Sequence, residues 1–385
     1  MHFEFATSSR ILFGTGSISE VPALAASLGQ RAFFITDSLE RSSILRDSLI
    51  SAGLSVEFLL IKQEPVLDII VMATRNFQAT SRQVVIGFGG GSALDTGKAI
   101  AALLQNPGDP LAFLEVVGSG KPLQNPSTPF IAIPTTAGTG SEVTRNAVIS
   151  LPEKRIKVSL RSPYMLPRIA VIDPALSYSL PPSITASTGL DALTQLIEPF
   201  VCISPSPLTD TFCRDGILRA ARSLHTACQN GKDAAAREDM ALASLFGGLA
   251  LANARLGAVH GMANPIGGYS RAPHGAVCAR LLALVMETNL NALRIRLPAS
   301  PAIARYTEEA RLLTGDATAM AEAGVDWVRQ LCNSLKIKPL KEYGLNPDDF
   351  LAVVAQSQKA NSMKGNPVSL TDSELLSILE SAYAD

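Results

Sequence analysis

The chain has 385 residues, of which 47% are hydrophobic and 17% are charged, and its formal net charge is −1. This length predicts two domains, because one domain takes roughly 100–200 residues, and the apolar content excludes an intrinsically disordered chain. The near-zero charge argues against a nucleic-acid or anionic-membrane partner, and the sequence has no unbroken apolar run of the roughly 18 residues that a membrane span needs.

Strand and helix patterns alternate over the first part of the chain. Short apolar runs are separated by helical patterns of roughly 10–15 residues. We predict strands at 31–37, 54–61, 83–91, 129–136 and 169–174, and helices at 40–52, 66–80 and 93–104. This alternation predicts an α/β domain with a mainly parallel, Rossmann-like sheet that carries helices on both faces.

The pattern changes after about residue 179, where helices follow one another without a convincing strand. We predict helices at 183–202, 208–229, 234–260, 276–291, 302–314, 317–335, 347–355 and 371–383. The stretch NPIGGYSRAPH is expected to break the chain between the third and fourth of them. We therefore predict an α/β domain over residues 1–178 and an all-α domain over residues 179–385, with the boundary between Asp173 and Pro182.

The five cysteines are spread widely and none forms a CxxC pair, which predicts free thiols rather than a disulfide framework. The first residues, MHFEFATSSR, lack the basic segment and long apolar run of a signal peptide. Both features lead us to expect a cytoplasmic protein.

A glycine-rich turn joins a predicted strand to the helix at 93–104. Glycines let backbone N–H groups approach a phosphate closely, and the start of a helix adds a positive dipole end. An ordinary strand-to-helix turn explains the glycines equally well. The residues concerned are Gly89, Gly90, Gly91 and Ser92 in the turn and Asp95 and Lys98 in the helix.

Two further features lie at the ends of predicted strands. Thr135, Thr136 and Thr139 offer hydroxyl groups to ribose or phosphate oxygens, although a Thr-rich loop that caps a helix, with Glu142 in its first turn, is the commoner arrangement. Asp37 closes the strand at 31–37, where a carboxylate accepts ribose hydroxyls and repels a 2′-phosphate. A helix cap is the commoner role for such an aspartate.

Four residues of the second half suggest a metal site. Asp191 and Gln195 lie four residues apart, so one helix face presents both, and His260 and His274 lie fourteen residues apart. The predicted start of a helix near His274 favours a neutral imidazole, the form that binds metals. One aspartate and two histidines suit Fe(II) or Zn(II), while ordinary core or capping histidines are the alternative.

Taken together, these segments resemble the iron-containing (group III) alcohol dehydrogenase family, which shares its architecture with dehydroquinate synthase-like proteins. The resemblance covers nearly the whole chain and implies a dinucleotide-binding domain followed by an all-helical metal and substrate domain. It rests on these motifs: RILFGTGS, GFGGGSALDTGKAIA, PTTAGTGSEVT, IDPALSYSLPPSITASTGLDALTQLIEPFV and NARLGAVHGMANPIGGYSRAPHGAVCA.

The resemblance also implies roles for individual residues. Asp191, His260 and His274 match metal ligands of the family and are therefore the expected catalytic residues, and Asp37 matches the acid associated with a preference for NAD. The expected cofactor-binding residues are Asp37, Gly89, Gly90, Gly91, Ser92, Asp95, Lys98, Thr135, Thr136, Thr139 and Lys157.

This chain departs from the family pattern at two positions. Gln195 stands where the family has a metal-binding histidine, and Asn264 stands where a further histidine is usual. A carboxamide oxygen is a weaker and harder ligand than imidazole, so we expect Gln195 to be a weak fourth ligand or to give way to water. The Fe(II) or Zn(II) ion is then expected to bind weakly.

The resemblance implies an oxidoreductase, a homodimer, that transfers a hydride between NAD(H) and a small alcohol or aldehyde. The metal would act as a Lewis acid on the substrate oxygen. A metal-independent reductase of the maleylacetate reductase type and a non-catalytic nucleotide-binding relic are the alternatives. Arg255, Arg271 and Lys364 flank the expected site, which leaves both neutral and anionic substrates open.

Overall fold

The computed structural model describes residues 2–77 and 83–384 and divides into two compact units. One unit, here called the α/β unit, consists of Ala6–Thr136 and Gly140–Tyr178. The other, here called the helical unit, contains the described residues before Ala6, the short segment Ala137–Thr139 and the chain from Ser179 onward.

The α/β unit is built on a six-stranded sheet with the order β1-β8-β5-β4-β2-β3. All five neighbouring pairs are parallel, so the predicted parallel α/β architecture is confirmed. The strands are β1 (Arg10–Phe13), β2 (Arg31–Thr36), β3 (Ser55–Leu60), β4 (Gln83–Gly89), β5 (Phe130–Pro134) and β8 (Ile169–Ile172).

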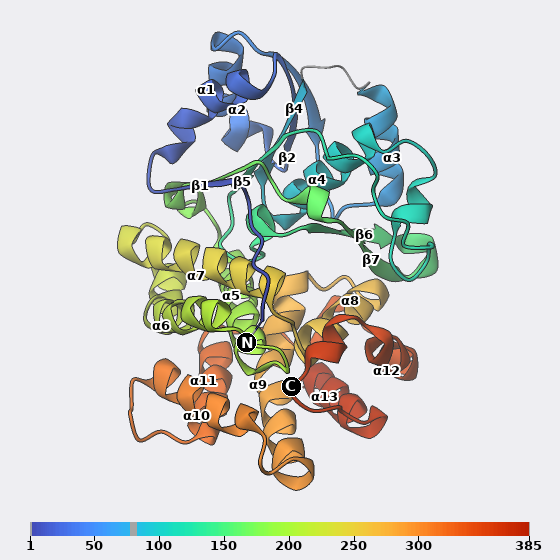
Figure 1. Ribbon diagram of the computed structural model, residues 1–385. Helices are drawn as coiled ribbons and strands as arrows, with labels where there is room; N and C mark the ends of the chain where they lie inside the picture. Colours follow the sequence, from blue (N-terminus) through green and yellow to red (C-terminus); the bar gives the residue numbers. More distant parts are fainter. Residues whose placement is uncertain (1, 78–82, 385) are drawn as a thin grey trace. The chain divides into compact units, whose positions relative to one another are not determined.

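Helices cover both faces of this sheet (Figure 1). Side chains alternate along a strand, so Phe34 of β2 packs on the face of α1 (Val21–Leu28) and α2 (Leu39–Ser51), together with Ile86 of β4. Phe33 and Val85 point to the opposite face. There they pack with α3 (Leu67–Asn76) and α4 (Gly91–Gln105). The inner strands β2, β4, β5 and β8 read as largely apolar runs because both of their faces are buried, whereas the edge strands β1 and β3 are half-exposed.

Several elements of the α/β unit do not appear among the predicted ones. They are β1, α1 and an antiparallel pair, β6 (Asn146–Leu151) and β7 (Ile156–Arg161). The pair is half-buried: Ala147, Ile149, Val158 and Leu160 join the same apolar cluster as α4 while the residues between them are more exposed. Such short alternating segments give a weaker sequence signal than a fully buried strand.

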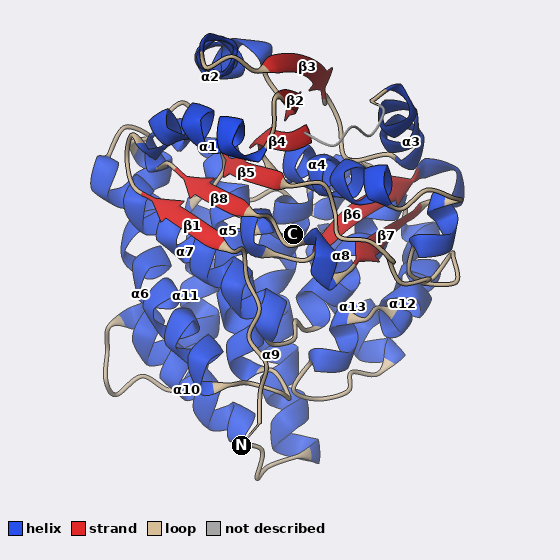
Figure 2. Cartoon of the chain, turned by 45° about the horizontal axis from the view of Figure 1, so that its top comes forward, coloured by secondary structure: helices blue, strands red, loops and turns tan. Residues whose placement is uncertain are grey.

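The part of the helical unit that the structure describes contains no strand (Figure 2). Its first helices are α5 (Pro182–Val201), α6 (Pro207–Gln229), α7 (Ala234–Asn253), α8 (Ala258–Tyr269) and α9 (His274–Arg296). The later helices are α10 (Pro301–Thr314), α11 (Ala321–Ser334), α12 (Phe350–Lys359) and α13 (Asp372–Ala384).

One predicted helix of this unit is wrong. The stretch 234–260 forms two helices, α7 and α8, that are bent by 97° at a break between Asn253 and Ala258. The stretch from Asn264 to Tyr269, expected to be part of a break, is instead the second half of α8, with Pro265 inside the helix. The physical reason for the earlier break lies in side chains that hold the start of α8, described below.

Helix α9 packs against α5, α8, α11 and α13 and forms the middle of the apolar core of the helical unit. By length and composition alone it could cross a membrane, but 72% of its most apolar window is buried within the protein. This burial is what the core helix of a folded unit requires.

Candidate functional site

Between the ends of β2 and β4, the direction in which successive strands are added to the sheet reverses. From β2 the chain moves outward to β3, whereas β4 lies on the other side of β2. In open parallel sheets, ligands bind beyond the carboxyl ends of the strands at such a switch point. Asp37 follows β2 and Gly90 follows β4, and the Gly90 N–H donates to Asp37 Oδ2 over 2.8 Å. The two predicted cofactor features therefore meet at this position.

Asp37 is held in place from two directions. Arg41 forms an ion pair with Asp37 Oδ1 at 2.8 Å, and Arg41 also donates to Thr135 Oγ1 over 3.2 Å. Ser38, not Asp37, caps α2, because the Ser38 hydroxyl accepts from the Arg41 N–H. Gly89 has a φ of 155°, and a Cβ there would lie 2.7 Å from Asp37 Oδ2. The turn thus needs glycine for its backbone conformation and for space.

The predicted threonines fall into both units. The Thr135 N–H donates to the Gly89 carbonyl, and Thr136 lies close enough that a Cβ on Gly90 would be 3.4 Å from its methyl group. Both therefore border the glycine-rich turn. Thr139 belongs to the segment Ala137–Thr139 of the helical unit.

Asp95 and Lys98 are engaged inside the α/β unit. Asp95 accepts from the Ser141 hydroxyl and from the Val148 N–H, and it lies 3.2 Å from the Lys98 ammonium group. Lys98 is buried and donates to Ser141 O and Thr144 Oγ1. Burial lowers the pKa of Lys98, although the nearby Asp95 opposes this shift. These bonds tie α4 to the segment that follows β5.

Lys157 on β7 pairs with Glu64 at 2.5 Å and is largely buried. Glu64 also lines a cavity of about 260 Å³ beyond the end of β3, at the same carboxyl edge of the sheet as Asp37. Thr96 of α4 lines this cavity too, and among the described residues its buried hydroxyl oxygen has no hydrogen-bond partner. The cavity therefore offers a polar group at its wall.

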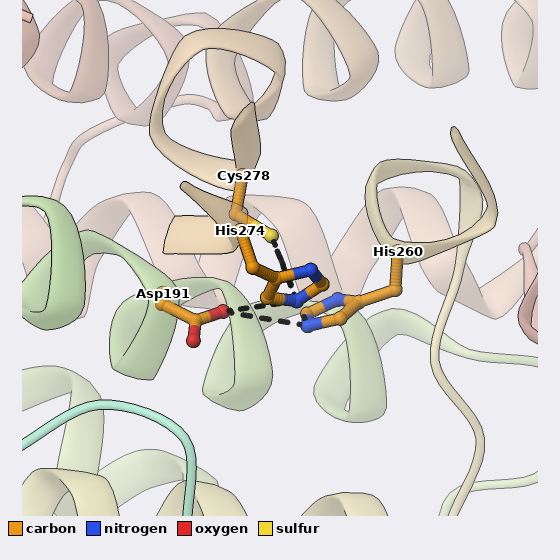
Figure 3. Close-up of side chains that lie close together, drawn as sticks. All are labelled: Asp191, His260, His274 and Cys278. Carbon is orange, nitrogen blue, oxygen red and sulfur yellow. Dashed lines mark hydrogen bonds and ion pairs between the residues drawn. The ribbon is translucent and has the colours of Figure 1, made fainter. Parts of the chain in front are cut away.

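In the helical unit, three helices bring a carboxylate, two imidazoles and a thiol together (Figure 3). Asp191 comes from α5, His260 from the first turn of α8, and His274 and Cys278 from the first turns of α9. Asp191 Oδ1 lies 3.5 Å from His260 Nε2 and 3.8 Å from His274 Nε2. One ligand atom from each of the four residues lies within 4.8 Å of the others.

Glu198 orients His260 from behind. Its Oε2 lies 2.6 Å from His260 Nδ1, and both side chains are buried. A Nδ1–H that donates to this carboxylate leaves the lone pair of Nε2 directed at Asp191 and His274, an arrangement typical of metal-binding histidines. Glu198, which our sequence analysis did not single out, lies on α5 seven residues after Asp191.

Glu198 also explains the break before α8. Its Oε1 accepts from the Val259 N–H over 2.7 Å, and Asn366 Oδ1 accepts from the Ala258 N–H over 3.0 Å. Two of the free N–H groups at the start of a helix are thereby satisfied by side chains from distant segments. A Cβ on Gly257 would lie 2.9 Å from both side-chain oxygens, so this approach requires glycine.

The ionisable groups of the cluster shift one another's pKa values. Burial raises the pKa of Asp191, but the nearby imidazoles of His260 and His274 lower it by more, so the net shift is downward. Burial by itself lowers the pKa of both histidines. Cys278 and the neighbouring carboxylates raise it by a larger amount, so the net shift is upward. These neighbours therefore outweigh the helix-start effect expected near His274 and favour positive charge on the imidazoles.

A divalent metal fits this donor set. Asp191 Oδ1 is buried and, within the described chain, has no hydrogen-bond partner, although it faces two imidazole nitrogens. Such an oxygen needs a proton or a cation as its partner. Carboxylate, imidazole and thiolate are the ligands of Zn(II) sites, and carboxylate with imidazole also suits Fe(II).

The two positions that depart from the resemblance are also buried polar groups. Gln195 lies one turn after Asp191 on α5, and Asn264 lies on α8. Gln195 Oε1 and Asn264 Oδ1 both lack a hydrogen-bond partner among the residues described. Cys278, the fourth member of the cluster, was missed at the sequence level, although it follows His274 by four residues and so shares its helix face.

The comparisons with known proteins define the class of protein. The family description "Iron-containing alcohol dehydrogenase" matches residues 8–174, and its C-terminal counterpart, "Fe-containing alcohol dehydrogenase family, C-terminal", matches residues 185–383. The chain therefore belongs to the iron-containing alcohol dehydrogenase family, and the resemblance inferred from its motifs is confirmed.

Individual relatives agree with this assignment. The chain is 33% identical over 379 residues to "Alcohol dehydrogenase 4" of Saccharomyces cerevisiae (strain YJM789), covering 96% of each chain. A crystal structure of 1,3-propanediol oxidoreductase superposes with a TM-score of 0.90 at 30% identity, covering 100% of both chains. The sulfoacetaldehyde reductase of Bifidobacterium kashiwanohense, solved with NAD⁺, gives 0.86 at 27% identity over 100% of this chain and 99% of that chain.

The chain is accordingly an NAD-dependent oxidoreductase that acts on small alcohols and aldehydes, and its family uses a divalent metal. The reaction class expected from the sequence is thereby confirmed, and it is favoured over the two alternatives, a metal-independent reductase and a non-catalytic relic. The individual site residues stay predictions.

Proposed function

We propose that Asp191, His260 and His274 hold the divalent metal of this oxidoreductase and are its catalytic residues, with Gln195 either a weak fourth ligand or replaced by water. The single observation that supports this proposal best is the buried Asp191 Oδ1, which faces two imidazole nitrogens without a hydrogen bond. When bound, the metal supplies Lewis-acid polarisation of the substrate oxygen.

The residues of the chain itself set up this chemistry. Asp191 contributes a full negative charge at a buried position, which favours a divalent cation over water. Glu198 holds the His260 ring so that Nε2 is available to the metal. Asn366 holds the start of α8, and thereby the position of His260, through its hydrogen bond to the Ala258 N–H.

We also propose that the dinucleotide binds at the switch point of the α/β unit. Asp37 would accept ribose hydroxyls, and the backbone of the glycine-rich turn would contact the pyrophosphate. Asp95 and Lys98 would support the cofactor site by holding the segment after β5. The proposed cofactor-binding set is Asp37, Gly89, Gly90, Gly91, Ser92, Asp95, Lys98, Thr135, Thr136, Thr139 and Lys157.

In this proposal, residues 1–178 form the dinucleotide-binding domain and residues 179–385 the metal and substrate domain. Five free cysteines support a cytoplasmic location. We further propose a homodimer, which size-exclusion chromatography with light scattering would test. Arg255, Arg271 and Lys364 are exposed in the helical unit, so a substrate with an anionic group also fits.

One experiment tests the metal proposal. Freshly purified protein is analysed for metal, and NADH oxidation is followed with a panel of aldehydes before chelation, after chelation and after addition of Fe(II) or Zn(II). We expect activity to fall on chelation and to return with the metal. Activity that chelation leaves unchanged would overturn the metal proposal and favour a metal-independent reductase.

A further inference from the structure

We propose that Cys278 supplies the fourth protein ligand of the metal, as a thiolate, and that this ligand shifts the metal preference of the site toward Zn(II). The inference rests on the proposed function, because it assumes that Asp191, His260 and His274 bind a metal. It goes further because it assigns a donor that Gln195 was expected to provide.

The first argument is the spacing of the donor atoms. Cys278 Sγ lies 3.5 Å from His274 Nε2 and 4.0 Å from His260 Nε2. In a tetrahedral zinc site with bonds of about 2.0–2.3 Å, neighbouring ligand atoms are about 3.3–3.6 Å apart. Four of the six spacings among the donor atoms, 3.5, 3.5, 3.8 and 4.0 Å, lie at or slightly above these values, and all six are within 4.8 Å. Small side-chain movements would close the set around one ion.

The second argument is the position of Cys278 on α9. A residue four positions after His274 lies on the same helix face, and helical side chains point back toward the helix start. The thiol therefore points back at the His274 ring, as Figure 3 shows. Cys278 is completely buried, so the thiol faces the imidazoles without competing solvent.

The third argument concerns the competing donor. Gln195 packs toward α7: a Cβ on Gly247 would lie 3.1 Å from its Cβ and 3.6 Å from its Oε1. Asp191 instead packs toward α9, since a Cβ on Gly275 would lie 3.4 Å from its Cβ. The helix that carries His274 and Cys278 is therefore the one that Asp191 faces, while the Gln195 carboxamide lies against a different helix.

A thiolate changes which metal the site prefers. Sulfur ligands favour Zn(II) over the harder ions that carboxylate and carbonyl oxygens suit, and Zn(II) also exceeds Fe(II) in intrinsic affinity. On metal binding the thiol loses its proton to solvent, so the metal–sulfur bond forms with release of one proton. Zn(II) should therefore displace Fe(II) from this chain at equal concentrations.

The test uses the full-length protein depleted of metal and loaded with Co(II) as a probe. We expect a thiolate-to-cobalt charge-transfer band in the near ultraviolet, which Cys278→Ser abolishes. Gln195→Ala and Cys332→Ser should keep it; Cys332 is also buried, but its thiol donates to the Ala279 carbonyl. Cys278→Ser should lower Zn(II) affinity by at least the about 10–100-fold that loss of an outer-shell partner costs.

A second measurement needs no variant. X-ray absorption of the Zn(II)-loaded, unmutated protein should show one sulfur ligand at about 2.3 Å. Co(II) or Zn(II) that binds without a sulfur ligand, with affinity that His260→Ala lowers and Cys278→Ser does not, would overturn the cysteine inference and leave the proposed function intact. If neither Co(II) nor Zn(II) binds, both the cysteine inference and the proposed metal site are overturned.

Discussion

The two candidate sites of this chain are assembled in different ways. At the switch point of the α/β unit, the Gly90 N–H and the glycine-rich turn present backbone groups at the ends of neighbouring strands. In the helical unit, four side chains from α5, α8 and α9 converge. Backbone sites depend on strand order and local glycines, whereas side-chain sites depend on how helices pack. Apart from its glycines, we expect the first kind to be less sensitive to side-chain substitution than the second.

The largest expected effect tests this contrast directly. Asp191→Asn removes the anionic ligand with little change of shape, so we expect loss of the metal and a fall in kcat/KM of at least about 1000-fold, since a metal Lewis acid supplies several kcal/mol. NADH binding should be unchanged. Metal analysis, steady-state kinetics and NADH fluorescence titration measure the three quantities. Full activity with an intact metal content would contradict the side-chain account of this site.

A stability effect of about 3 kcal/mol is expected in the α/β unit. Burial raises the pKa of Glu142 to about 7 from 4.5, despite its own backbone hydrogen bond and the attraction of Lys98. The folded state then binds more protons than the unfolded state between these values, so stability falls as pH rises from about 4.5 to about 7. Glu142→Gln removes this loss.

The measurement is urea unfolding of wild type and Glu142→Gln at pH 5 and pH 7.5. The free energy of unfolding of the variant relative to wild type should increase by up to about 3 kcal/mol from pH 5 to pH 7.5, because one pKa unit corresponds to about 1.4 kcal/mol. Glu153→Gln, an exposed change at the β6–β7 turn, is the matched control and should show no such growth. An equal advantage at both pH values would refute the assignment.

A smaller effect, on metal affinity, is expected from Glu198, which contacts His260 on the side away from Asp191 and His274. Glu198→Gln keeps the shape of the side chain but loses the charge that holds the His260 Nδ1–H, so metal affinity should fall about 10–100-fold. Zn(II) titration against a competing chelator measures it. If Glu198 served only to hold the start of α8, thermal stability would fall while metal affinity stayed the same.

Substitution of Asp37 beside the glycine-rich turn should change the cofactor preference through charge and should not abolish cofactor binding. Asp37→Asn removes the like charge that a 2′-phosphate would meet and frees Arg41 to pair with that phosphate. We expect the ratio of kcat/KM for NADPH over NADH to rise about tenfold, equivalent to about 1.4 kcal/mol. Ser38→Ala is the control: it should cost about 1 kcal/mol of stability with no change of cofactor ratio. A wild type that already prefers NADPH would contradict the role of Asp37.

The smallest effect concerns the substrate. If the substrate carries an anionic group, Arg255→Ala should raise KM for a carboxylated aldehyde about threefold, the size expected of an exposed ion pair, and leave neutral aldehydes unaffected. Arg294→Ala, a surface change in the last turn of α9, serves as control. Equal kcat/KM for neutral and carboxylated aldehydes in the wild type would remove the anionic alternative.

Much of the fold could be predicted from the sequence because the relevant signals are local. Apolar runs bounded by turns and long helical periodicity are strong local signals, so β2–β5, β8 and most helices of the second half lie close to their predicted ranges. The half-buried β6–β7 pair and the short β1 have weaker patterns, and the 78–80 part of one predicted helix lies outside the described residues.

The sequence by itself determined the family, the parallel α/β architecture and the candidate residues Asp37, Asp191, His260 and His274, because motifs and periodicity are carried by neighbouring positions. Only the tertiary structure decided the break before α8, since Glu198 and Asn366 reach the Val259 and Ala258 N–H groups from distant segments.

Tertiary structure also decided which fourth donor lies beside the histidines. Gln195 and Cys278 are each four residues from a proposed ligand, so helical spacing allows both equally. The packing of α5 against α7 and α9 separates them: Gln195 lies against Gly247 of α7, while the Cys278 thiol lies 3.5 Å from His274 Nε2. Helix packing is set by side chains far apart in the chain, which local spacing does not encode.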